Sequence, residues 1–254
     1  MPPLSRLSLS EGGRYSCHPS DKLRESAPQV TRTLDDLLAL ASWMTRLDDA
    51  QQARVRREMT EWSVPAGGFV CRKGDPVDHW FGVIDGLAKV SSVSADGKSV
   101  TFIGVPPGGW FGEGSMLKDE PRRYDAVALR DSRIAGMPRA TFLWLLDTSI
   151  PFNRFLLLQL NERLGQFVAT VEFDRLLGPD ARVARCLAQM FNRLLYPGSG
   201  PKLEISQGEL GYLTGLSRQR VNQALQTLER QGLLAVEYGS ITVLSLDGLR
   251  SFDG

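Results

Sequence analysis

"ISQGELGYLTGLSRQRVNQALQTLERQGLL", residues 205–234, decides the fold of the C-terminal part of the chain. Ser206 and Glu209 have the spacing of a capping box, which predicts a helix that begins at Gln207. A Thr-Gly pair predicts the end of this helix, and Ser217 can cap a second one. Two capped helices separated by a glycine turn predict a helix-turn-helix.

The second of these helices has an apolar stripe and a polar opposite face. At about 100° per residue, the stripe of Val221, Ala224, Leu225 and Leu228 directs the polar residues outward or to the flanks. Amide side chains can bind adenine, and arginine can bind guanine or a phosphate. We therefore expect a DNA-recognition helix; the alternative is an ordinary solvated surface. The candidate DNA contacts are Ser206, Gln207, Ser217, Arg218, Gln219, Arg220, Asn222 and Gln223.

The segment "LLAVEYGSITVL" at 233–244 follows the recognition helix. Its two β-prone runs on either side of Gly239 and Ser240 predict a hairpin. Such a wing can bring its backbone close to the phosphates of DNA.

The composition limits the class of protein. The chain has 254 residues, 42% of them apolar, which is enough for two domains. A net charge of +1 excludes a globally basic nucleic-acid binder but allows a local basic stripe. Cys17, Cys71 and Cys186 lie far apart, so neither disulfides nor a metal or iron–sulfur site is expected.

Other classes of protein are disfavoured by missing patterns. Apolar runs such as "FLLLQL" at 155–160 are too short to cross a bilayer, and the N-terminus lacks the apolar segment of a signal peptide. We expect a cytoplasmic protein without membrane contact. The sequence has no catalytic triad, metal-ligand cluster or phosphate-binding Gly-Lys-Ser/Thr loop, and only His18 and His79 as histidines. We expect no enzymatic activity, no catalytic cofactor and no metal.

The region before the helix-turn-helix divides into three parts. Residues 1–32 are rich in Ser, Pro, Arg and Gly without periodicity, which predicts a disordered extension. Residues 33–147 begin with helical spacing and continue, from Val64 to Met137, as short β-rich runs separated by glycine and proline. "ADGK" at 95–98 is the clearest hairpin, so an antiparallel sandwich or barrel is expected.

Residues 148–178 predict one long helix, with Pro151 in its first turn. Its apolar residues recur at spacings of four, three and four, which is typical of a coiled-coil contact between two copies of a helix. The alternative is a helix that lies on its own β domain. The candidate dimer contacts are Leu160, Leu164, Phe167 and Val171.

With a β domain, a long helix and a winged helix in this order, residues 35–245 resemble the cAMP receptor protein and FNR (Crp/Fnr) family of bacterial transcription regulators. The most specific parts are the helix-turn-helix and "FGEGSMLKDEPRRYDAVAL" at 111–129, which resembles the family's phosphate-binding cassette. The resemblance implies an α+β fold. It comprises an N-terminal jelly-roll-like β-roll of the cyclic-nucleotide-binding type with leading helices (33–147), a dimerisation helix (148–178) and a winged helix-turn-helix DNA-binding domain (179–254).

The resemblance also implies roles within the cassette. Glu113 matches the glutamate that binds the ribose hydroxyl in cyclic-nucleotide-binding members, and Arg123 matches the arginine that pairs with the cyclic phosphate. A guanidinium fork meets phosphate oxygens with two charge-assisted hydrogen bonds. The alternative is a Glu113–Arg123 salt bridge that closes an empty roll. The full candidate effector set is Gly112, Glu113, Arg122, Arg123, Tyr124 and Phe167.

The sequence departs from the family's cAMP-binding pattern. Tyr124 stands where a Ser or Thr is usual, and the positions that bind the adenine base appear as Phe167 and Val168, which donate no hydrogen bond. Arg122 beside Arg123 offers a second cation, and Tyr124 offers a stacking face. These features motivate the hypothesis that the effector is cyclic di-GMP rather than cAMP.

The function expected from the sequence is a homodimeric transcription regulator that binds a double-stranded operator and is controlled by a cyclic nucleotide, cyclic di-GMP or cAMP. RNA polymerase is a further candidate partner. One alternative is a cyclic-nucleotide-binding signalling module that acts through protein partners. Another is a DNA binder of the same family that needs no ligand.

Overall fold

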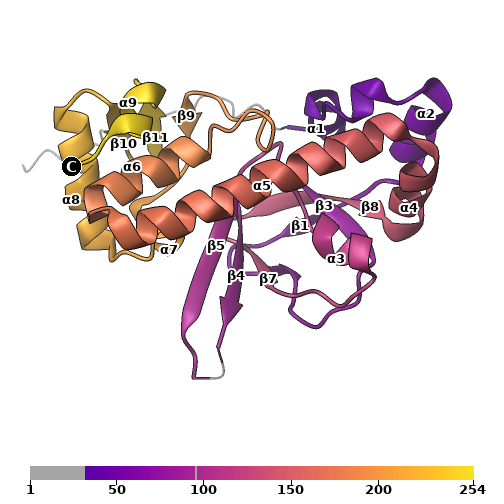
Figure 1. The fold of residues 1–254 in the computed structure, drawn as a ribbon, viewed down its shortest axis with the longest axis horizontal. Coiled ribbons are helices and arrows are strands. Elements are labelled where there is room, and N and C mark those ends of the chain that lie inside the picture. The colour runs from indigo at the N-terminus through magenta and orange to yellow at the C-terminus, as the bar shows by residue number, and fades with distance from the viewer. Residues whose placement is uncertain (1–31, 95) are drawn as a thin grey trace, which may run out of the picture. The chain divides into compact units, whose positions relative to one another are not determined.

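The computed structural model describes residues 32–94 and 96–254. The extension predicted over residues 1–32 lies outside the described residues except for Arg32. Along the chain, two helices lead into a β domain, which is followed by a long helix and by a group of helices with a small sheet (Figure 1). The predicted α+β class is confirmed.

The leading helices are α1 (Leu34–Leu40) and α2 (Asp49–Glu58), with a 3-10 turn at Met44–Arg46 between them. Each α-helix starts with a capping box, Thr33 with Asp36 in α1 and Asp48 with Gln51 in α2. Their apolar sides pack into an aromatic core that includes Trp43, Trp80, Trp110, Phe142 and Phe152.

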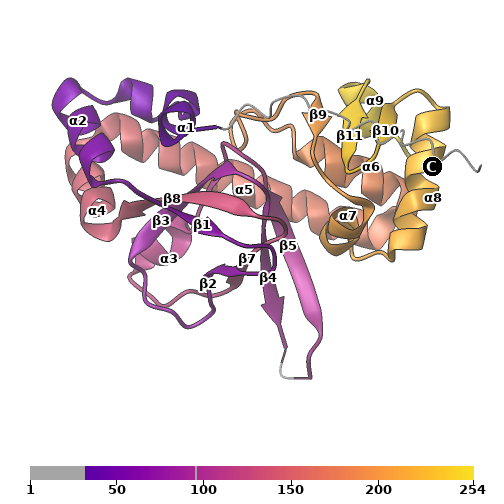
Figure 2. The same ribbon diagram turned by 180° about the vertical axis from the view of Figure 1, so that it is seen from behind.

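The β domain consists of two four-stranded antiparallel sheets, in the orders β1-β8-β3-β6 and β2-β7-β4-β5. Both sheets contribute side chains to one apolar core, as expected for two packed layers. Figure 2 shows these strands from the side opposite to Figure 1. The strands are β1 (Thr60–Val64), β2 (Phe69–Cys71), β3 (His79–Asp85), β4 (Ala88–Val93), β5 (Ser99–Val105), β6 (Trp110–Phe111), β7 (Asp125–Ala128) and β8 (Ser132–Pro138).

Two further segments complete the β domain. β4 and β5 form the predicted hairpin, in which Val93 pairs with Ser99. A short helix, α3 (Glu113–Lys118), lies between β6 and β7, and α4 (Arg139–Thr148) follows β8. The cassette residues therefore lie on a turn, a short helix and the approach to β7.

The long helix α5 (Ile150–Leu176) is capped by Ser149, whose hydroxyl accepts from the Phe152 amide. Phe152, Phe155 and Leu156 belong to the aromatic core of the β domain. The first half of α5 therefore lies on its own β domain, which was the alternative interpretation of this helix.

The C-terminal part contains α6 (Pro179–Gln189), α7 (Gln207–Thr214), α8 (Arg218–Arg230) and α9 (Leu246–Ser251). A three-stranded sheet, in the order β10-β11-β9, is formed by β9 (Lys202–Leu203), β10 (Leu234–Glu237) and β11 (Ser240–Val243). The helices and the sheet share one apolar core. The predicted hairpin around Gly239 is thus the β10–β11 wing, with Gly239 in the left-handed conformation that such a turn requires (φ +74°).

Candidate nucleic-acid interface and effector site

The two helices of the helix-turn-helix have the predicted caps. The Ser206 amide donates to Glu209 Oε2 at 2.6 Å, and the Glu209 amide donates to Ser206 Oγ at 3.2 Å. α7 ends at Gly215, whose φ of +66° is a conformation that glycine adopts without strain. Ser217 Oγ then accepts from the Arg220 amide at 3.2 Å and starts α8. Ser206 and Ser217 therefore act first as helix caps.

The outward face of α8 carries three of the predicted DNA contacts. Val221, Ala224, Leu225 and Leu228 are buried in the C-terminal core. Arg218, Gln219 and Gln223 are exposed. The amide and guanidinium groups that can contact base edges thus project from the N-terminal half of the helix.

The other predicted contacts on α7 and α8 are engaged within the protein. Gln207 Nε2 donates to Asn222 Oδ1 at 2.9 Å, so these two amides join α7 to α8. Arg220 Nη2 lies 2.5 Å from Asp180 Oδ1 in the first turn of α6, and the Arg220 side chain is 32% exposed. The contact of Arg220 with DNA stays a prediction, and in this structure its charge is paired with Asp180.

The wing adds a residue that the sequence analysis did not single out. Tyr238 is fully exposed at the turn between β10 and β11. A cleft separates this turn from the starts of α7 and α8, with Gln207, Arg218 and Tyr238 in its lining. The exposed faces of α8 and the wing therefore meet at one cleft. An aromatic residue in a hairpin turn was the available signal for Tyr238.

In the β domain, the cassette directs Glu113 inward. Gly112 adopts a φ of +98°, and the following Glu113 is buried at the start of α3. The Trp80 indole donates to Glu113 Oε2 at 3.4 Å. The carboxylate has further lone pairs, so it can also accept from a ligand hydroxyl.

The two adjacent arginines of the cassette point in opposite directions. Arg122 is 2% exposed and donates from Nη1 to the Gly112 carbonyl at 3.0 Å and from Nη2 to the His79 carbonyl. Its guanidinium lies 4.6 Å from the centre of the Phe81 ring, and its Nε is buried without a partner. Arg122 is therefore the inward-facing cation of the cassette.

Arg123 occupies the outer position. Its side chain is 71% exposed and forms a two-bond ion pair with Glu120, at 3.1 and 2.7 Å. This corrects the assignment of Arg123 to the phosphate position, since its guanidinium faces solvent. The alternative Glu113–Arg123 salt bridge is also wrong, because Glu113 pairs with Trp80.

Tyr124 and Phe167, two of the predicted effector contacts, lie against the core of the β domain. Tyr124 is half-buried against the core of the β domain, and burial raises the pKa of its phenol. Phe167 packs against the same core, with its ring centre 6.5 Å from that of Phe102. Val168, in contrast, is exposed. Only the first of the two base-binding positions on α5 therefore faces the β domain.

Arg163 is a buried polar residue that the sequence analysis did not identify. Its Nη1 donates to the Tyr196 hydroxyl at 2.6 Å, and its Nη2 donates to the Trp110 carbonyl at 3.1 Å. Tyr196 belongs to the segment between α6 and β9, yet it is buried in the core of the β domain. The signal in the sequence that could have identified Arg163 is an arginine on the face of α5 that otherwise carries buried residues.

The predicted dimer contacts divide between two faces of α5. Leu164 and Val171 are exposed, but Phe167 faces the β domain and Leu160 is half-buried. In this structure Phe167 contacts its own domain, and Leu160, Leu164 and Val171 stay predicted dimer contacts. The exposed apolar stripe consists of Leu157, Leu164, Val168 and Val171.

The described part of the chain lacks the features of a membrane-spanning helix and of a metal site. Within residues 32–94 and 96–254, no helix is both long and apolar enough to cross a membrane. The same residues contain no group of three or more His, Cys, Asp and Glu side chains that could hold a metal ion. His79 lies beside the rings of Trp62 and Phe81, and burial lowers its pKa.

Comparisons with known proteins agree with this architecture. The cyclic nucleotide-binding domain family matches residues 61–149, and the Crp-like helix-turn-helix domain family matches residues 181–252. A CRP-like cAMP-activated global transcriptional regulator of Mycobacterium tuberculosis is 25% identical over 213 residues, covering 83% of this chain and 95% of the relative. The cyclic AMP receptor protein of Thermus thermophilus is 29% identical over 179 residues, covering 70% and 81%.

Solved structures show the same fold. FixK2 from Bradyrhizobium japonicum superposes with a TM-score of 0.65 at 22% identity, covering 77% of this chain and 98% of that one. The c-di-GMP responsive regulator CLP of Xanthomonas campestris gives 0.56 at 22% identity, covering 77% and 99%. With both domain families matched in order along the chain, the protein belongs to the cAMP receptor protein and FNR family of transcription regulators.

Proposed function

We propose that the chain is a homodimeric, sequence-specific transcription regulator whose binding to DNA is controlled by a cyclic nucleotide in the β domain. The observation that carries the proposal is the outward face of α8. There Arg218, Gln219 and Gln223 are exposed on a helix whose opposite side is buried in the C-terminal core. Side chains of these types can contact both base edges and phosphates in a major groove.

The exposed apolar stripe of α5 supports the proposal that the protein is a homodimer. Leu157, Leu164 and Val171 are seven residues apart, and Val168 lies between the last two. This is the spacing of a coiled-coil contact, and a second copy of α5 is the occupant that matches it. A dimer also suits an operator with two half-sites.

Sedimentation velocity tests this stripe. Leu164→Glu places a charge in the stripe and is expected to give monomers. Leu158→Glu is the matched control, because Leu158 is also exposed but lies about 100° around the helix from Leu157. A Leu164→Glu protein that sediments as the wild type does would contradict the proposed contact.

Glu113 and Arg122 support a cyclic nucleotide as the effector. They place one carboxylate and one guanidinium inside the β domain, which suits a sugar hydroxyl and a phosphate. The outward position of Arg123 weakens the argument for two phosphates, whereas Tyr124 and Phe167 retain apolar faces for a base. The candidate ligands are therefore cAMP and cyclic di-GMP, and cGMP is tested beside them.

Calorimetric titration with these three nucleotides tests the effector site. Arg122→Gln is expected to abolish saturable binding, and Arg123→Gln, at the neighbouring exposed position, is expected to retain it. The reverse result would restore Arg123 as the phosphate ligand. Absence of heat with the wild-type protein for all three nucleotides would reject a nucleotide effector.

A DNA binder that needs no ligand is the second candidate, and one observation favours it. The core of the β domain is occupied by its own side chains, including Leu195 and Tyr196 from beyond α6. Arg122 is also bonded to two carbonyls. A ligand phosphate would share the guanidinium with these carbonyls or replace one of them, and any bond that it replaces reduces its net affinity. Contact with RNA polymerase stays a prediction.

A further inference from the structure

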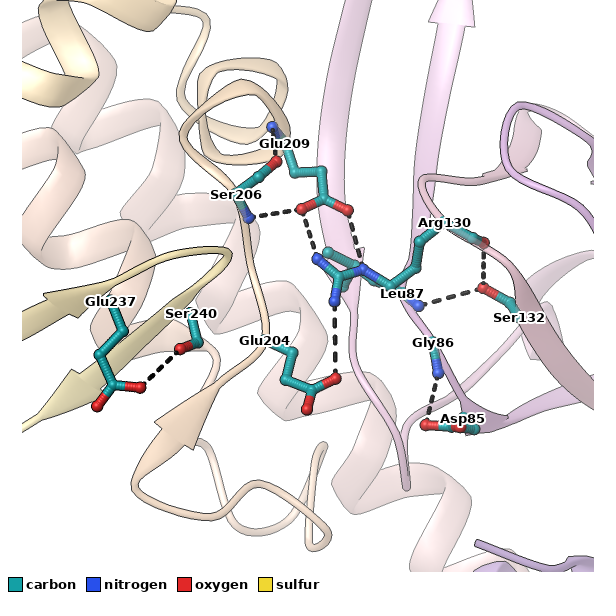
Figure 3. Close-up of polar contacts among 10 residues, drawn as sticks. All are labelled: Asp85, Gly86, Leu87, Arg130, Ser132, Glu204, Ser206, Glu209, Glu237 and Ser240. Carbon is teal, nitrogen blue, oxygen red and sulfur yellow. Dashed lines mark hydrogen bonds and ion pairs between the residues drawn. The ribbon is translucent and has the colours of Figure 1, made fainter. Parts of the chain in front are cut away.

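Arg130 joins the β domain to the helix-turn-helix. It lies on the loop between β7 and β8 and donates from Nε to Glu209 Oε1 at 2.9 Å and from Nη2 to Glu209 Oε2 at 2.5 Å (Figure 3). Its Nη1 also lies 3.8 Å from Glu204 Oε2. This is the two-bond fork geometry in which arginine is most selective for a carboxylate.

Glu209 has a second role in the same contact. Its carboxylate accepts the Ser206 amide and so closes the capping box at the start of α7. The Glu209 side chain is only 10% exposed. Burial alone would raise the pKa of Glu209, but the hydrogen bonds from Arg130 and Ser206 outweigh burial and hold the pKa below its usual range. Arg130 therefore binds the N-terminus of α7, the first helix of the helix-turn-helix.

Other contacts surround this ion pair and fix the direction of α7. Leu213 lies over Gly104 of β5. A Cβ atom added at Gly104 would come within 2.9 Å of Leu213 Cδ1. Lys89 Nζ of β4 lies 4.6 Å from the centre of the Tyr212 ring. Gly104 and Lys89 are partners in the β4–β5 register. α7 therefore rests on one pair of strands and is held at one end by Arg130.

The ion pair is also connected to the cassette. β7 starts directly after Tyr124 and ends two residues before Arg130. It is hydrogen-bonded to β2 on one side and to β4 on the other, as a central strand of its sheet. A short strand with neighbours on both sides therefore links the cassette directly to the loop that carries Arg130.

Charge gives Arg130 a further effect on the DNA-facing surface. Glu204 and Glu209 lie on either side of Ser206, which with Gln207 is a predicted DNA contact. Without Arg130, two carboxylates would remain beside the predicted DNA contacts Ser206 and Gln207, one of them buried without a cation. Both effects oppose DNA binding in the docked arrangement.

We propose that Arg130 is a positioning residue for DNA binding: through Glu209 it holds the helix-turn-helix in the orientation that a two-half-site operator requires. Arg130 itself does not contact DNA. The inference rests on the proposed function, since half-site spacing has meaning only for a DNA-binding dimer.

The test measures binding to two palindromes that differ only in spacing. One has the half-site spacing selected by the wild-type protein, and the other is longer by about five base pairs, roughly half a helical turn. Arg130→Gln is expected to weaken binding to the first palindrome by about tenfold or more and to abolish the preference for its spacing. The preference for bases within each half-site is expected to stay unchanged.

Three variants accompany Arg130→Gln. Glu209→Gln keeps the capping box, because glutamine can replace glutamate there, but it loses the charge. It is expected to relax the spacing preference too, and the double variant is expected to be no worse than either single one. Arg130→Lys should retain part of the spacing preference that Arg130→Gln loses. Arg133→Gln is the control, since Arg133 pairs with Glu61 within the β domain at 2.6 Å.

A second measurement needs no DNA and separates the two proposals. Spin labels are attached at Val93 and Leu244, both exposed, after the three native cysteines are replaced by alanine. The wild-type background is expected to give a narrow distance distribution, and Arg130→Gln a broad one. An equally narrow distribution in Arg130→Gln, or an unchanged spacing preference, would overturn the role of Arg130. Failure of the wild type to select any DNA site would instead reject the proposed function.

Discussion

The recognition helix α8 exposes its polar side chains, whereas the cassette buries one of its two arginines. On α8, Arg218, Gln219 and Gln223 project from the protein. In the cassette, Arg122 is buried and is already bonded to the Gly112 and His79 carbonyls. The three exposed side chains of α8 are therefore available to DNA without rearrangement, whereas the Arg122 guanidinium holds internal bonds that a ligand phosphate would have to share or replace. This difference suits the proposed control by a ligand, because a phosphate at Arg122 would act on bonds that the β domain makes within itself.

The largest expected effect comes from removing Arg122. Arg122→Met keeps much of the side-chain volume but leaves two carbonyls without their donors and removes a cation from the Phe81 ring. We expect the free energy of unfolding to fall by about 2 to 3 kcal/mol, measured by urea denaturation. The exposed neighbour Arg123→Met should leave it unchanged. If both variants unfolded at the same urea concentration, the buried network would not be stabilising the domain.

On the DNA-binding face, Gln219→Ala is expected to change specificity and leave stability unchanged. Loss of one amide contact should reduce discrimination at one base position of each half-site by about 1 to 3 kcal/mol, measured by site selection. Gln226→Ala is the control, because Gln226 is exposed further along the same face. A selected-site profile that is identical for Gln219→Ala and wild type would show that Gln219 does not contact a base.

The pH dependence of unfolding tests the ion pair between Glu209 of α7 and Arg130 of the loop between β7 and β8. The pKa of Glu209 is lowered in the folded protein relative to its usual value of 4.5. Its ionised form therefore adds stability at pH values above 4.5, and this contribution is lost as the pH falls through the folded pKa. The difference in stability between wild type and Glu209→Gln should shrink over that range. A difference that stays constant with pH would mean that the charge of Glu209 is not involved.

The smallest effect concerns Cys71, which lies in the core beside the effector site. Burial raises the pKa of its thiol to about 11. At pH 8 we expect almost no alkylation of Cys71 in the native protein. Loss of the Arg122 charge alone would raise the pKa of the thiol further, so we expect faster alkylation in Arg122→Met only through opening of the destabilised domain. Both rates are measured by mass spectrometry of the peptide. Rapid alkylation in the wild type would show that the interior opens without any change at Arg122.

The part of the site that could be predicted from the sequence is the part with periodicity. In α8 the spacing of Val221, Ala224, Leu225 and Leu228 fixes which side is buried, so the exposed positions follow from it. The capping box of Ser206 and Glu209 likewise fixes where α7 begins. Local patterns of this kind determine local structure because their partners lie within a few residues.

The arrangement of the cassette and of α5 was harder to predict from the sequence, for a physical reason. Residues 119–124 form an irregular segment, so no repeat indicates which of two adjacent arginines faces inward. α5 has apolar residues on two faces, one for its own β domain and one exposed, and spacing alone does not separate Phe167 from Val168. The partners of Arg130, Arg163 and Arg220 come from distant segments, which a single sequence does not bring together.

The most direct test of the account is the affinity of the purified protein for its selected palindrome, with and without cAMP, cGMP and cyclic di-GMP, measured by fluorescence anisotropy. We expect that one nucleotide changes the affinity of the wild type and that Arg122→Gln loses this response while Arg123→Gln keeps it. An unchanged affinity with every nucleotide would contradict control by a cyclic nucleotide, and the absence of any selected site would contradict sequence-specific DNA binding itself.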